Sequence, residues 1–185
     1  SKDSRADQLF ATLDGKAKLD QIHILQDMYP LLRDAKTQTI VLNAINNGFP
    51  YALYTKKYDE YMDRLDDIKS SCVITIKSNL EDKYFADNLT DLLNQNKFKI
   101  SDNASNSDIS INLKSSPKYS IASGWNIAKV STTLSVVSNG NVVSNKIITS
   151  LGRSSTSPES ALEDASKKFR AEIEKQTLDS VVFAK

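Results

Sequence analysis

The chain has 185 residues, of which 39% are apolar and 25% are charged, proportions typical of a globular protein that can bury a core without disulfides or metals. Its 24 basic and 23 acidic residues give a formal net charge of +1, so no excess of one sign would attract nucleic acid or an anionic membrane surface. No apolar run approaches the roughly 18 residues that a membrane-spanning helix requires.

The first five residues are polar, which is not the pattern of an export signal. Any signal peptide or lipid-accepting cysteine would therefore have to lie upstream of Ser1. The single cysteine, Cys72, lies in the apolar run 72–76. We expect it to be a small buried side chain rather than a reactive thiol, and it leaves the redox compartment open.

Residues 1–70 are predicted to form a helical segment of three or four helices, because apolar residues recur at helical spacing from Asp7 to Lys69. A stop or kink is expected at Pro30, and a helix end at 47–50, where glycine precedes proline. The last helix carries a tyrosine seam, which either packs the helices together, the favoured interpretation, or presents rings to a partner. Its members are Tyr51, Tyr54, Tyr58 and Tyr61.

At Ser71 the apolar period changes from helical to alternating, which predicts a second domain over residues 71–185. Strand 72–77 comes first, and residues 78–81 have the spacing of a helix capping box. Phe85, Leu89, Leu92 and Leu93 then share one helical face. Two further strands are expected, a short one at 98–100 and one at 109–113 that ends before Pro117.

A β-hairpin follows, because strands at 125–137 and 142–151 flank the dipeptide Asn139-Gly140. Gly152 is expected at the strand-to-helix corner with a positive φ. The triplet 157–159 begins a final helix, and the apolar end 181–183 is either a frayed terminus or a small docking strand. The buried stripe of this helix is Ala161, Ala165, Phe169 and Ile173. The predicted class is α+β: a helical amino-terminal segment, then a mainly antiparallel sheet with two helices on one face.

No residue pattern predicts a catalytic, cofactor-binding or metal site, so we expect a protein without cofactors that is not an enzyme. Asp20, His23 and Asp27 share a helix face, but a lone histidine with flanking carboxylates is more typical of solvated surface. Ser115-x-x-Lys118 and the triplet 101–103 match fragments of penicillin-recognising enzymes, in reversed order and without the Lys-Thr-Gly element. An enzyme would need a deep pocket lined by Asp20, His23 and Asp27 or by the Ser115 loop.

The segment 118–125 is the candidate partner-binding region. It places Tyr119, Ile121 and Trp125 beside Gly124, and aromatic and aliphatic anchors of this kind dominate protein interfaces. The alternative, equally open from the sequence, is a strand edge with Trp125 packed into the sheet.

Five segments occur in a specific order in the second domain: 89–94, 98–100, 107–111, the hairpin 134–147, and 157–161 with Ala165 after it. In this order they resemble the TolB amino-terminal-like domain of bacterial envelope proteins, a group with CsgG, LpoB, FlgO, FlgT and small outer-membrane lipoprotein antigens. The resemblance covers residues 71–180.

The resemblance implies an exported periplasmic protein, anchored at the outer membrane only through an upstream lipid, that acts as a structural or assembly module. Its partners would be other envelope proteins or further copies of itself. The lipopolysaccharide-assembly lipoprotein LptE is similar in its order of strands and helices. It supports the alternative of a lipid or small-molecule carrier with a cleft between sheet and helices.

Overall fold

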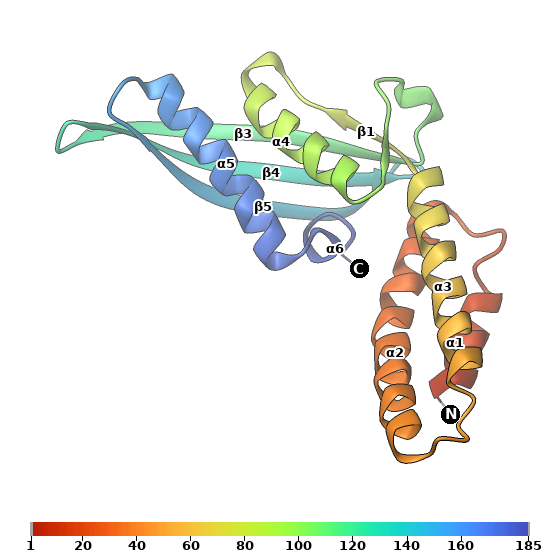
Figure 1. Ribbon diagram of the computed structural model, residues 1–185. Coiled ribbons are helices and arrows are strands. Elements are labelled where there is room, and N and C mark those ends of the chain that lie inside the picture. The colour runs from red at the N-terminus through yellow and green to blue at the C-terminus, as the bar shows by residue number, and fades with distance from the viewer. Residues whose placement is uncertain (1, 185) are drawn as a thin grey trace. The chain divides into compact units, whose positions relative to one another are not determined.

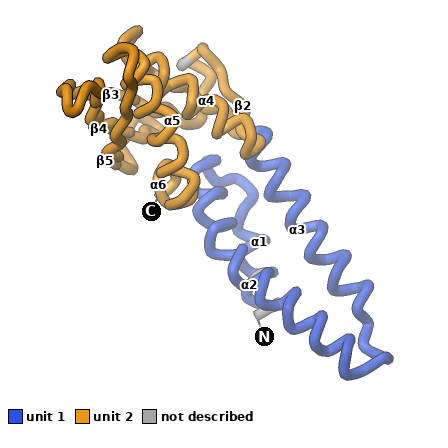
Figure 2. The backbone as a smooth tube through the Cα atoms, turned by 60° about the vertical axis from the view of Figure 1, so that its left-hand side comes forward, with its two compact units in different colours: residues 1–71 blue, residues 72–185 orange. Residues whose placement is uncertain are grey.

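A computed structural model describes residues 2–184. The chain divides into two compact units, residues 1–71 and 72–185 (Figure 2). The first is helical and the second combines a five-stranded sheet with helices, which confirms the predicted α+β class.

The helical unit consists of three helices whose apolar faces pack together. They are α1 (Lys2–Ala11), α2 (Lys18–Ile45) and α3 (Tyr51–Ser71). Two ion pairs hold the start of the unit against α3. Lys57 Nζ lies 2.7 Å from Asp7 Oδ2 on α1, and Arg64 Nη2 lies 2.9 Å from Asp14 Oδ1 in the loop after α1. The largest buried side chains include Leu13, Ile22 and Met28.

α2 continues through Pro30, so the predicted helix stop there is wrong. Pro30 is exposed, whereas Met28 and Leu32 beside it are buried. A proline on the solvent side of a helix removes one backbone bond where water can replace it. Burial of the neighbouring side chains outweighs that local cost.

The second unit has one sheet in the order β2-β1-β3-β4-β5. β1 is parallel to both of its neighbours, and β3, β4 and β5 are antiparallel. The strands are β1 (Val73–Lys77), β2 (Lys99–Ile100), β3 (Ile109–Ala122), β4 (Trp125–Ser138) and β5 (Asn141–Ser154). The helical elements are η1 (Leu80–Asp82), α4 (Lys83–Gln95), η2 (Ala104–Asn106), α5 (Pro158–Gln176) and α6 (Leu178–Val181).

α4 and α5 lie on one face of this sheet, as predicted (Figure 1). The predicted buried stripes of both helices are confirmed: Phe85 and Leu89 on α4 and Phe169 and Ile173 on α5 are fully buried. The Phe85 and Phe169 rings meet edge to face, 5.4 Å between centroids. Cys72 is also fully buried, as expected.

β3 runs through Pro117 to Ala122, so the predicted strand end is wrong. The reason lies in the sheet: β1 pairs with β3 only as far as Asn112, and beyond that point β3 has a partner on one side only. Proline is tolerated at a sheet edge, because its missing N–H would face no strand. Two-residue turns with positive φ then close both hairpins, at Ser123-Gly124 and at Asn139-Gly140.

Gly152 lies inside β5 and does not have the positive φ that the sequence suggested. A Cβ atom there would lie 1.9 Å from the carbonyl oxygen of Ala161 and 2.4 Å from the backbone nitrogen of Ala165. The glycine is therefore required by the close approach of the α5 backbone to the strand, rather than by a corner.

The start of η1 and the last residues of the chain also differ from expectation. The capping interaction is one residue later than predicted, since the backbone N–H of Asn79 donates to the Asp82 carboxylate. The segment 181–183 is neither frayed nor a strand. Val181 ends the short helix α6, the N–H groups of Val182 and Phe183 donate to carbonyls of that helix, and all three side chains are buried. The Phe183 ring packs 4.8 Å from that of Phe98, which explains the burial.

Candidate functional site

The β3–β4 hairpin carries all three candidate partner-binding residues but divides them between two faces. Tyr119 pairs with Ala128 and Ile121 with Asn126, on the side of the sheet that the helices cover. Trp125 pairs with Ala122 and so lies on the opposite side. Tyr119 and Trp125 are similarly exposed, 51% and 49%.

Tyr119 and Ile121 border a groove between the hairpin and the amino-terminal ends of α4 and α5. We call this the hairpin groove. Its main part has a volume of about 630 Å³ and is lined by Leu80, Glu81, Lys83, Tyr84, Tyr119, Pro158, Glu159 and Leu162. It continues past Tyr119 and Pro158 into a second hollow lined by Ser120, Ile121, Asn126 and Ile127.

Two of the most exposed apolar side chains in the second unit lie along the hairpin groove, Leu80 at 89% and Ile121 at 78%. Single exposed apolar residues are ordinary, but an apolar group around a concave surface is typical of a binding site. Three segments far apart in the sequence form this group, namely η1, the β3–β4 hairpin and the start of α5.

Asp82 fixes the exposed position of Leu80. Its carboxylate is fully buried and accepts hydrogen bonds from the backbone N–H of Ser115, at 2.7 Å, and from the Ser115 hydroxyl. A buried carboxylate is stable only when it is hydrogen-bonded in this way. These bonds anchor η1 to β3, and the Leu80 side chain is left in solvent.

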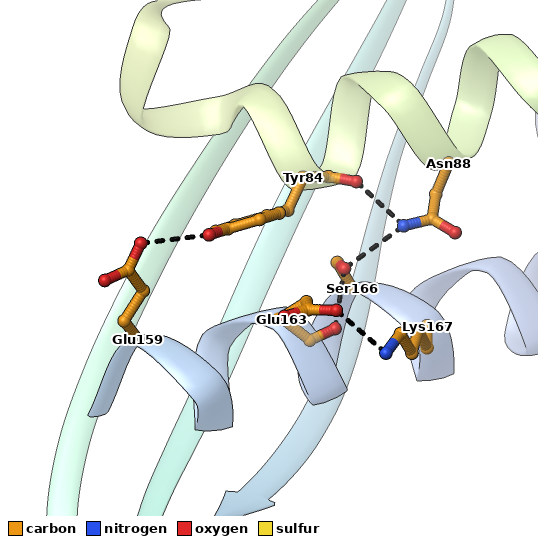
Figure 3. Close-up of polar contacts among 6 residues, drawn as sticks. All are labelled: Tyr84, Asn88, Glu159, Glu163, Ser166 and Lys167. Atoms are coloured by element: carbon orange, nitrogen blue, oxygen red, sulfur yellow. Dashed lines mark hydrogen bonds and ion pairs between the residues drawn. The ribbon is translucent and has the colours of Figure 1, made fainter. Parts of the chain in front are cut away.

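A polar network joins the two helices beside the groove (Figure 3). The Tyr84 hydroxyl donates to Glu159 Oε1 at 2.9 Å, which raises the pKa of Tyr84. Asn88 Nδ2 donates to the Tyr84 carbonyl and to Ser166 Oγ at 3.1 Å. The α4 and α5 walls of the groove are therefore fixed to each other before any partner arrives.

The sequence motifs considered for chemistry are not brought together. Asp20 and Asp27 are exposed, and no group of three or more His, Cys, Asp or Glu that could hold a metal occurs within residues 2–184. The Ser115 hydroxyl is buried against Asp82 and so is already in use. Within the described chain, no helix combines the length and the apolar character needed to cross a membrane.

The tyrosine seam of α3 is only partly used in packing. Tyr61 is buried, and its ring centroid lies 4.8 Å from that of Phe10. Tyr51 and Tyr58 are half-buried, and Tyr54 is exposed. The favoured interpretation, core packing, therefore holds for the end of the seam near α1.

No protein-family model and no curated protein matches the sequence. Among solved structures, a minor lipoprotein from Acinetobacter baumannii is similar with 12% identity and a TM-score of 0.46, over 56% of this chain and 90% of that one. The lipoprotein GNA1162 from Neisseria meningitidis is similar with 12% identity and a TM-score of 0.38, over 57% of this chain and 96% of that one. At this level of identity no residue role transfers to this chain.

Sequence reasoning missed Leu80, Pro158 and Leu162 as groove residues. Leu80 and Pro158 were read only as parts of helix starts, which they also are. The one signal in the sequence was Leu80 itself, a large apolar residue among polar and charged neighbours.

Proposed function

We propose that the second unit is a non-catalytic binding module of the bacterial envelope that holds an apolar segment of a partner protein in the hairpin groove. The observation that carries the proposal is the gathering of Leu80, Tyr119 and Ile121 around a concave surface with fixed walls. The order of segments from Ser71 onward, which resembles envelope domains, supports the cellular setting.

The carrier alternative is less well supported. A carrier would hold its ligand between the sheet and its helices, and that space is filled by side chains. Phe85, Leu89, Phe169 and Ile173 are fully buried there. The hairpin groove is open to solvent along its length, which suits a protein segment better than an enclosed lipid or metabolite.

Two exposed isoleucines provide a matched test of the groove. Ile121 lies along it, whereas Ile147 is 68% exposed on the uncovered face of the sheet. Ile121→Asp should weaken binding to a co-purified envelope partner by about 30-fold or more, the effect of losing a central anchor. Titration by calorimetry or interferometry measures this. Equal weakening by Ile147→Asp would contradict the proposal.

The envelope setting has its own test. Fractionation of cells that express the full-length gene product should place the protein in the periplasmic or outer-membrane fraction. Recovery in the cytoplasmic fraction would contradict the envelope part of the proposal and leave the groove to be tested separately.

A further inference from the structure

The end of the α2–α3 helical pair that carries the turn between the two helices exposes apolar side chains in several directions. We call residues 37–55, which include the turn between the two helices, the helical tip. Ile45 is 78% exposed and Leu53 is 66% exposed. Ile40, Val41 and Leu42 are also exposed. Since consecutive helical residues point about 100° apart, these three face different sides of α2.

The helical tip is free of charge in a chain that is one quarter charged. No Asp, Glu, Lys, Arg or His occurs between Lys36 and Lys56. A helix that docks in a protein groove is apolar on one side and polar on the other. A helix that is apolar around its circumference fits a medium that surrounds it, and a lipid layer is such a medium.

Lysines mark the border of the helical tip on both helices. Moving away from the turn, the first charged residue is Lys36 on α2 and Lys56 on α3, with Lys57 next. Lys36 Nζ lies 4.3 Å from the centre of the Tyr58 ring. Lysines and tyrosines at the edge of an apolar segment are typical of the headgroup layer, where the amine meets phosphate and the ring lies at the interface.

The backbone of the turn is largely satisfied from within. The N–H of Asn46 donates to the Leu42 carbonyl at 2.8 Å and that of Phe49 donates to the Asn46 carbonyl at 3.0 Å. The N–H of Gly48 donates to the Asn46 side chain at 3.0 Å, and Pro50 has no N–H to satisfy. Removal of this turn from water therefore leaves few donors unpaired.

We propose that the helical tip inserts into the interfacial layer of a lipid bilayer that contains anionic headgroups. The apolar side chains enter the acyl boundary, and Lys36 and Lys56 contact the phosphates. Asn43, Asn46 and Asn47 keep the insertion shallow, because amides are costly to bury in hydrocarbon. This proposal concerns the helical unit and does not depend on the hairpin groove.

Flotation of the whole 185-residue chain with vesicles tests the proposal. Two vesicle types are compared, phosphatidylcholine alone and phosphatidylcholine with phosphatidylglycerol. We expect stronger binding to the second type. The double variant Ile45→Asp, Leu53→Asp should bind at least about tenfold more weakly than the parent, and Lys36→Gln, Lys56→Gln should show a weaker preference for the anionic vesicles. Ile147→Asp, at a 68% exposed site in the other unit and outside the hairpin groove, is the matched control and should bind as the parent does.

A second measurement, tryptophan fluorescence, tests the insertion even if a charged variant folds poorly. In a Trp125→Phe background, Leu53→Trp should shift its emission to the blue when the anionic vesicles are added. No shift, or equal flotation of the double aspartate variant, would overturn the proposal. A dimer that forms without vesicles would also overturn the proposal if the double variant Ile45→Asp, Leu53→Asp dissociates it and the parent does not float with vesicles. The helical tip would then be a contact between copies of the chain.

Discussion

Gly152 sets how closely α5 approaches the sheet. Gly152→Ala places a methyl group on the backbone of α5, so we expect a loss of at least about 2 kcal/mol in the free energy of unfolding. Gly48→Ala is the matched control, because a Cβ there would meet only the Asn46 side chain, at 3.4 Å. Urea denaturation measures both. A loss for Gly48→Ala as large as that for Gly152→Ala would contradict this account of the packing.

Thr132 is buried on β4, and its hydroxyl has no hydrogen-bond partner among the residues that the structure describes. A buried hydroxyl without a partner loses its bonds to water and gains none in return. Thr132→Val keeps the shape and should raise the free energy of unfolding by about 1 kcal/mol.

Thr75 serves as the opposite case, because its buried hydroxyl donates to the Ser101 carbonyl at 2.9 Å. Thr75→Val should therefore lower stability by about 1 kcal/mol. Equal effects of the two substitutions in chemical denaturation would show that hydrogen bonding does not distinguish these sites.

The sequence indicates that position 152 requires glycine, but it does not show which structural constraint imposes the requirement. Glycine is required both for positive φ and for close backbone approach, and only the position of α5 decides between them. Asn139-Gly140 was predicted correctly because its turn depends on neighbours in the sequence alone.

Between elements, Asp164 joins α5 to the end of β5. Desolvation raises its pKa, but hydrogen bonds from Lys168 and from the Arg153 N–H outweigh this, and the pKa lies below the ordinary 3.8. A lowered folded-state pKa contributes stability above the unfolded pKa, and that contribution is lost as the pH falls through the folded pKa.

Asp164→Asn keeps an acceptor for the Arg153 N–H and removes the charge. We expect it to cost less than about 1 kcal/mol at pH 7, since solvent screens the partly exposed pair, and the difference from the parent should close as the pH falls below 3.8. Denaturation curves at several pH values measure this, with Asp59→Asn as a surface control. A difference that does not change with pH would contradict the assignment.

Helix and strand positions were predicted well wherever apolar period and turn residues agreed, as in α4, α5 and the β4–β5 hairpin. The two errors at prolines share one cause. Pro30 lies on a solvent face and Pro117 lies where β3 is paired on one side only, and neither circumstance can be read from the sequence. Tertiary packing decides whether a proline interrupts an element.

For the whole molecule, the sequence indicated Tyr119 and Ile121 but not the groove that they border. Leu80 and Leu162 join them only because the sheet brings η1 and α5 beside the β3–β4 hairpin. The chain's composition shows the same limit. A net charge of +1, which averages over the whole chain, argues against attraction to a membrane. It does not show that the uncharged residues 37–55 lie together at one end of the helical unit.

The most direct measurement of the proposed function is photocross-linking in living cells from the two faces of the β3–β4 hairpin. A photoreactive phenylalanine analogue replaces either Tyr119, in the groove, or Trp125, which is equally exposed on the other face. The account predicts an adduct of defined mass with an envelope protein from position 119 and none from position 125. Adducts of equal yield from both positions, or from position 125 alone, would contradict it.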